Sequence, residues 1–177
     1  MASLSLEQAA QRLMDCYQGW FDIAPCPEEA PLTARMDFHA HSSQYVLSKK
    51  AVLWEAESHE YVYLFQMPHL TLETYRACEA LVYQEGMSRI QPGPGHMYTY
   101  LTALFLCQTC DEQARRALKA CRRHKSFRFA YWGWMDMHTG LAELEKERVT
   151  ANFSGRKSAK NLSHALFRPL PSRGKGR

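Results

Sequence analysis

Five ionisable side chains in the first half of the chain have the types and spacing of a metal-binding patch. Asp37, His39 and His41 alternate with other residues, so in an extended strand they share one face. Glu55 and Glu57 share a face of a neighbouring strand by the same rule. If the two faces coincide, these groups could bind Mg²⁺ or Mn²⁺ and lower the pKa of a bound water. The simpler alternative, which we favour, is a charged sheet face that water solvates.

An acid on an early strand, followed by Glu-x-Glu on a later one in an α-β-β-β-α-β order, resembles the restriction-endonuclease-like phosphodiesterases. The resemblance implies a catalytic metal held by Asp37, Glu55 and Glu57. Nearby histidines would assist: His39, His41 or His59. The chain departs from the commoner acid-x-Lys pattern, because Glu57 stands where that pattern has a lysine.

Cys107, Cys110, Cys121 and His124 follow one another with the spacing of a structural zinc site. Residues 111–123, however, have a helical pattern, and a helix would place Cys121 roughly 16 Å from Cys110. That separation is too large for ligands of one ion. We therefore expect Cys121 in the core and Cys107 at the end of a buried strand. A redox-active Cys107–Cys110 pair is the alternative, since a helix N-terminus lowers a thiol pKa.

Nucleic-acid binding is a further possibility, because residues 111–125 carry six cations that could track phosphates. They are Arg115, Arg116, Lys119, Arg122, Arg123 and Lys125. The aromatic residues of 126–135 could stack bases, or they could form core on one face and a subunit interface on the other. We favour core plus interface and expect a homodimer.

The elements that must position these residues follow from the hydrophobic pattern. Helices are expected at 5–20, with a capping box formed by Ser5 and Gln8, at 70–87, ended by Gly86, and at 111–123.

Strands are expected elsewhere. Residues 33–65 predict three antiparallel strands with turns near Ser42, Ser48 and Ser58. Residues 97–107 are apolar on both faces, which predicts a central strand, and 126–135 predict an aromatic strand. Residues 138–145 fit a strand or a short helix. The order α-β-β-β-α-β-α-β predicts an α+β fold, with a mainly antiparallel sheet of about five strands and helices packed on one face.

Composition places these elements in one domain. Hydrophobic residues make up 46% of the 177 residues, which is enough for a packed core. All 18 acidic residues precede residue 151, whereas the remainder has seven Lys/Arg. We therefore expect a slightly acidic domain at residues 1–150 and a disordered basic tail at 151–177, in which residues 158–166 could form one or two helical turns. The tail could attract nucleic acid or acidic surfaces weakly. No secretion signal or membrane span is recognisable, so a cytoplasmic location with reduced cysteines is expected.

The segments Tyr45–Phe65 and His96–Thr102 are similar to an uncharacterised bacterial family, a domain of unknown function. The resemblance implies a bacterial cytosolic protein and carries over no functional residue. The leading hypothesis is a non-catalytic binding or assembly protein without a cofactor. A metal-dependent phosphodiesterase is second, and nucleic-acid binding by the basic segment and tail is third. Whether the chain is an enzyme is left open.

Overall fold

The computed structural model describes residues 4–45 and 52–168, and the side chains of these except at 41–45 and 52–56. Four helices and seven strands lie in this part of the chain. The helices are α1 (Leu6–Tyr17), α2 (Leu72–Arg89), α3 (Glu112–Ala120) and α4 (Arg156–Phe167). The strands are β1 (Asp22–Pro25), β2 (Leu32–Tyr45), β3 (Val52–Leu70), β4 (His96–Cys110), β5 (His124–Ser126), β6 (Trp134–Glu143) and β7 (Arg148–Ala151).

All seven strands belong to one mixed sheet. Its order is β1-β2-β3-β4-β6-β5, and β7 pairs with the second half of β6. The central strands β3, β4 and β6 are parallel, whereas β1, β2, β5 and β7 join by antiparallel pairing. The α+β class is therefore confirmed, and β4 is the central strand that was expected. The sheet is larger than predicted, and its centre is parallel because α2 and α3 carry the chain back across it.

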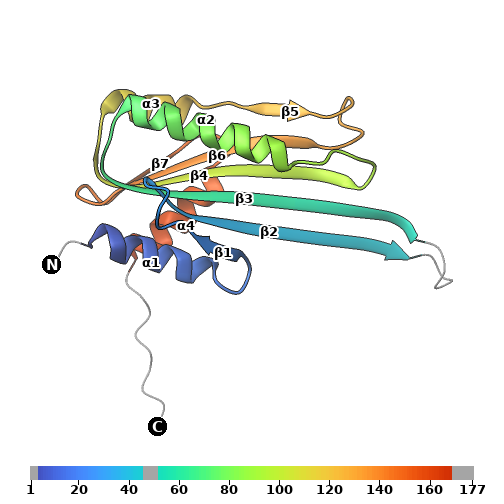
Figure 1. Ribbon diagram of the computed structural model, residues 1–177, viewed down its shortest axis with the longest axis horizontal. Helices are drawn as coiled ribbons and strands as arrows, with labels where there is room; N and C mark the ends of the chain where they lie inside the picture. The colour runs from blue at the N-terminus through green and yellow to red at the C-terminus, as the bar shows by residue number, and fades with distance from the viewer. Residues whose placement is uncertain (1–3, 46–51, 169–177) are drawn as a thin grey trace, which may run out of the picture.

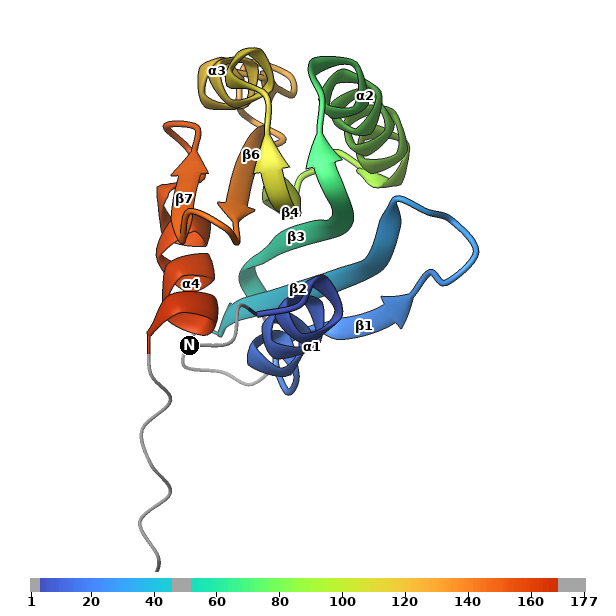
Figure 2. The ribbon, with the colours of Figure 1, turned by 90° about the vertical axis from the view of Figure 1, so that its left-hand side faces the viewer.

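Helices cover both faces of the sheet, and the prediction of one covered face was wrong. Figures 1 and 2 show α2 and α3 on one side and α1 and α4 on the other. Each side has its own apolar core, one around Phe65 and Phe105 and one around Leu13 and Leu104. A strand that is apolar on both faces, as β4 is, needs this double cover.

The described parts of segment 33–65 lie in two long strands, β2 and β3, where three were predicted. The turn predicted near Ser48 lies outside the described residues. Ser42 and Ser58, expected in turns, lie inside β2 and β3 and pair with Ala56 and Ala40. Continuous pairing along both strands overrides the local turn preference of serine.

The predicted helices exist with shifted ends. The Ser5–Gln8 capping box of α1 is present, and Thr71 caps α2. Gly86 does not end α2, which continues to Arg89. A Cβ at Gly86 would lie 2.5 Å from Leu101, so glycine serves close packing of α2 on β4. The third helix ends at Ala120, earlier than expected.

The aromatic strand predicted at 126–135 is instead a turn-rich segment. Arg128, Phe129 and Ala130 have positive φ angles, which a strand does not allow. The strand begins at Trp134 and runs to Glu143, so the ambiguous segment 138–145 belongs mostly to β6.

Most of the predicted basic tail is folded. Helix α4 lies within it and buries Leu162, Ala165 and Leu166 in the core shared with α1. The folded part of the chain therefore continues past residue 150 to α4. Residues 169–177, the rest of the predicted tail, lie outside the described residues.

Candidate functional site

Asp37, the first residue of the predicted metal patch, is held by α2. Arg89 forms a two-pronged ion pair with its carboxylate, and the Nη1–Oδ1 distance is 3.1 Å. The same guanidinium lies over the ring of Tyr61, 3.8 Å from the centroid. Both carboxylate oxygens are thus engaged, so Asp37 anchors the end of α2 to the sheet.

The strand register separates the predicted acidic ligands. His41 lies opposite Glu57 and Ser43 lies opposite Glu55, so Asp37 is four and six residues along β2 from these positions. At about 3.3 Å per residue, the separations are roughly 13 and 20 Å. Asp37 and Glu55 therefore do not meet at one ion. The side chains of His41 and Glu55 lie outside the described residues, and metal binding by members of this set stays a prediction.

His39 and His59 are brought together. They are register partners on β2 and β3, and their Nδ1 atoms are 2.7 Å apart. Among the side chains that the structure describes, no group of three His, Cys, Asp or Glu is arranged to hold a metal ion.

The opposite face of the sheet carries an aromatic layer on β4 and β6. Tyr98 stacks on Tyr100 at 4.6 Å and on Trp134 at 5.8 Å between ring centroids. Tyr100 also contacts His138 at 4.4 Å. The rings of Tyr98, Tyr100 and Trp134 are partly exposed. Figure 1 shows why: α1 and α4 lie under one end of the sheet, and the long strands extend beyond them.

Two carboxylates flank this aromatic layer. Glu60, Tyr100 and Asp136 are register partners across β3, β4 and β6, so their side chains form one row. Burial raises the pKa of Glu60, although a hydrogen bond from Thr102 and the nearby Lys157 oppose the shift. Asp136 pairs with His124 at 2.7 Å. One oxygen of each carboxylate is thus engaged by a neighbouring side chain.

A cavity of about 470 Å³ between α1 and α4 adjoins the row. Trp20 and Phe21 supply apolar lining, and Lys157, Asn161 and His164 supply polar lining. Lys157 lines the cavity and is close enough to Glu60, a member of the row, for its charge to lower the pKa of that carboxyl. Phe21 connects in turn to Phe38 on β2, with 5.4 Å between ring centroids.

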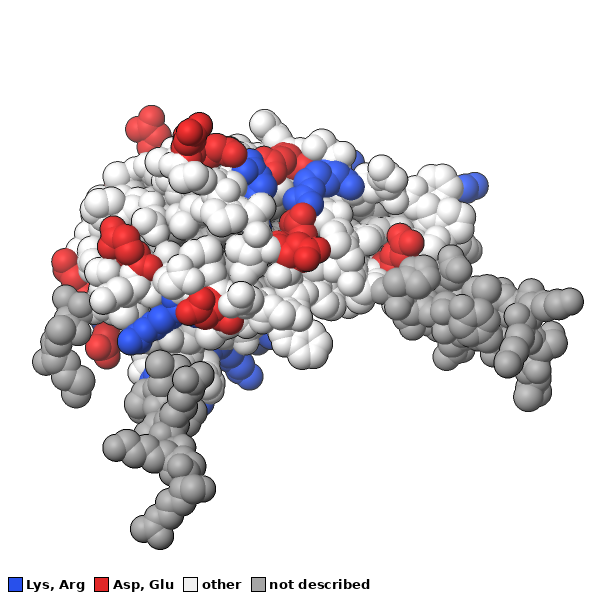
Figure 3. All heavy atoms as spheres, turned by 60° about the horizontal axis from the view of Figure 1, so that its bottom comes forward, with Lys and Arg blue, Asp and Glu red and all other residues white. Residues whose placement is uncertain are grey.

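Helix α4 carries three exposed cations at its start. Arg156, Lys157 and Lys160 are exposed on its first turns, and Arg156 lies over the ring of Phe153 at 4.3 Å. The surface in Figure 3 has acidic and basic side chains interspersed, not a field of one sign.

Half of the six cations in the predicted basic segment 111–125 are neutralised by acidic side chains of the same chain. Three of its cations form ion pairs within the chain: Arg115 with Glu143, Arg116 with Glu112 and Arg123 with Glu79. Because α3 ends at Ala120, the later cations do not continue its face.

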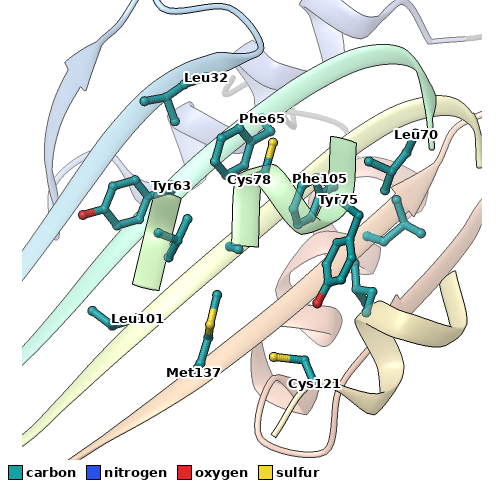
Figure 4. Close-up of a cluster of buried hydrophobic side chains, with 14 of the residues drawn as sticks. Leu32, Tyr63, Phe65, Leu70, Tyr75, Cys78, Leu101, Phe105, Cys121 and Met137 are labelled. Atoms are coloured by element: carbon teal, nitrogen blue, oxygen red, sulfur yellow. The ribbon is translucent and has the colours of Figure 1, made fainter. Parts of the chain in front are cut away.

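The cysteines of the apparent zinc pattern lie in the apolar core. Cys121 is buried beside Tyr75 and Met137, as Figure 4 shows, and Cys107 is fully buried. The expectation that Cys121 is a core residue is confirmed. Cys110 is nearly buried and its thiol donates to the carbonyl of Asp111.

Sequence reasoning missed the aromatic layer, Glu60 and the role of α4. The signal was present as Tyr98-x-Tyr100, an alternation at the start of β4 that we attributed to core on both faces. Which face stays open depends on where α1 and α4 end, and that is not a local property of β4.

The chain resembles one family in comparisons with known proteins. A family model described as Domain of unknown function (DUF8052) matches residues 5–164, which include most of α4. No curated protein and no solved structure matches the chain. No helix in the described ranges is both long and apolar enough to span a membrane.

Proposed function

The chain belongs to the DUF8052 family, a domain of unknown function, and for it we propose non-catalytic binding of single-stranded nucleic acid. The observation that carries the proposal is the layer of Tyr98, Tyr100 and Trp134 on the open half of the sheet. Aromatic side chains on a sheet stack unpaired bases, and each stack contributes roughly 1–3 kcal/mol.

The polar groups beside the layer suit a nucleotide. Glu60 and Asp136 can accept hydrogen bonds from exocyclic amino groups of bases that are not paired. Lys157 lies at the boundary between this row and the α1–α4 cavity, where it can reach a phosphate. Bases on the layer and phosphates along α4 would thus each find a partner of suitable chemistry.

Charge supports the same ligand. From residue 151 onward the sequence has seven Lys/Arg and no acid, and three of these cations lie on the first turns of α4. A single strand contacted by several of them should bind in a salt-dependent way, with a slope of about −0.7 per phosphate. The proposal keeps nucleic acid as partner and keeps the basic segment from residue 151, in which α4 lies, but leaves out segment 111–125.

The test is fluorescence anisotropy of labelled single-stranded 12-mers of RNA and DNA with the full-length protein. Replacing Tyr98 or Tyr100 by Ala should weaken binding about 5- to 150-fold, the equivalent of one lost stack. Tyr131→Ala is the matched control, since Tyr131 is an exposed tyrosine outside the layer. Absence of salt-dependent binding, or equal affinity of wild type and a Tyr98/Tyr100 double variant that melts normally, would refute the proposal.

Two other hypotheses have weaker support. A phosphodiesterase using Asp37, Glu55 and Glu57 stays a prediction, and the ion pair of Asp37 with Arg89 opposes it. Homodimer formation also stays a prediction; Phe129 and Tyr131 are largely exposed in the segment before β6 and could contribute.

A further inference from the structure

Two imidazoles face each other on the α2 side of the sheet, opposite the aromatic layer. His39 and His59 are direct register partners, and their rings meet edge-on with 5.0 Å between centroids. The 2.7 Å between the Nδ1 atoms leaves room for one shared proton. At least one ring must therefore present an unprotonated nitrogen.

The ring of His59 is held in place by its neighbours. On one side His96 stacks on it at 6.2 Å, and on the other Tyr61 stacks at 6.1 Å. A neutral imidazole held by its neighbours is the form that binds transition metals.

His96 supports the ring of His59 and is not itself available to a metal ion. Its Nδ1 lies 2.7 Å from the carbonyl of Trp132 and its Nε2 lies 2.8 Å from the hydroxyl of Thr99. Both nitrogens are thus engaged, so the two atoms available to one ion are those of His39 and His59. Glu57 lies near, with 3.8 Å between its Oε2 and the Nε2 of His59.

We propose that His39 and His59 bind one divalent ion of the Zn²⁺, Ni²⁺ or Cu²⁺ class through their Nδ1 atoms. Water completes the coordination shell. Imidazole pairs favour these ions, whereas Mg²⁺ and Mn²⁺ prefer carboxylates. Metal–nitrogen bonds of 2.0–2.1 Å in tetrahedral geometry place the two nitrogens about 3.3 Å apart. The rings therefore separate by roughly 0.6 Å, and the shared proton moves to Nε2 of its own ring.

This site differs from the patch expected from the sequence. It uses His59, omits Asp37 and Glu55, and selects another class of ion. It is also independent of nucleic-acid binding, because residues 59 and 60 point to opposite faces of β3.

The test is isothermal titration of the untagged full-length protein with ZnCl₂, NiCl₂ and MgCl₂ in a non-chelating buffer. One equivalent of Zn²⁺ and of Ni²⁺ should bind saturably, and Mg²⁺ should not. His39→Asn and His59→Asn should each abolish saturable binding. His69→Asn is the control, because His69 is exposed at the other end of β3 and should leave binding unchanged.

A second measurement needs no substitution. In ¹⁵N NMR of the wild-type imidazoles, Zn²⁺ should shift the Nδ1 signals of His39 and His59 and not those of His69. Absence of saturable Zn²⁺ and Ni²⁺ binding, binding retained in both variants, or unchanged Nδ1 signals would overturn the proposal.

Discussion

Arg115 and Glu143 form a bidentate ion pair with two contacts of 2.9 Å, and the Glu143 side chain has no exposure to solvent. Arg148 contacts the same carboxylate at 2.7 and 3.0 Å. Burial raises the pKa of Glu143, but the hydrogen bonds from Arg148 and Arg115 outweigh it, so the pKa is lowered. The charge at the end of β6 is thus buried only because two guanidinium groups compensate it.

Replacing Arg115 by Leu should destabilise the fold strongly. Removing one partner of a buried ion pair costs 3–5 kcal/mol, and we expect about 3 kcal/mol because Arg148 stays in place. Urea unfolding measures the change in the free energy of unfolding. Arg116→Leu is the matched control: Arg116 is 79% exposed and should change stability by less than about 0.5 kcal/mol. Equal effects of the two changes would contradict the role given to Arg115.

Gly133 should not tolerate a side chain. Its φ is +75°, and an added Cβ would lie 2.1 Å from the carbonyl oxygen of Met97. Gly133→Ala should cost at least about 2 kcal/mol, from backbone strain and displacement of the start of β4. Thermal unfolding would record the loss. Gly93→Ala, where a Cβ meets no atom within 4 Å, should melt within a few degrees of wild type.

Local signals in the sequence predicted local structure well. Ser5 and Gln8 predicted the start of α1, and alternation placed Asp37 and His39 together on one strand face. The partners of such residues could not be predicted in the same way. Asp37 pairs with Arg89, which is 52 residues away, and only the packing of α2 on the sheet brings them together.

The errors share one physical cause. An aromatic run such as 126–135 fits a strand or a packed turn equally, and the positive φ angles at 128–130 decide for a turn. Likewise, the basic composition of 151–168 suggested disorder with at most one or two helical turns at 158–166, although the apolar spacing of Leu162 and Leu166 suffices for the full helix α4 once a sheet face is available. Tertiary burial overrides composition in both cases.

Helix α4 should be required for folding. A chain ended at Ala151 loses Leu162, Ala165 and Leu166 from the core that includes α1 and one face of β4. Burying one such leucine contributes roughly 2 kcal/mol, so we expect loss of the cooperative thermal transition. A chain ended at Arg168 retains all of α4 and is the control. Cooperative melting of the shorter chain would instead support the domain boundary at residue 150 that the sequence predicted.

Because of His138, the free energy of unfolding should decrease as the pH is lowered from 6.5 to about 4. Burial lowers its pKa from 6.5 to about 4, with Asp136 opposing and Lys157 assisting the shift. Between these two pKa values the unfolded chain binds a proton at His138 that the folded chain does not bind. The contribution of His138 to stability is therefore complete above pH 6.5 and is lost as the pH falls toward 4. The full shift corresponds to roughly 3 kcal/mol.

Urea unfolding of wild type and His138→Gln at several pH values between 4 and 7.5 isolates this contribution. The difference in unfolding free energy between the two proteins should change by roughly 3 kcal/mol across that window, because other titrating groups are common to both. His164→Gln is the control, since His164 is exposed and should reproduce the wild-type slope. A constant difference between wild type and His138→Gln would mean that His138 has the same pKa in the folded and unfolded chains, with Asp136 balancing burial.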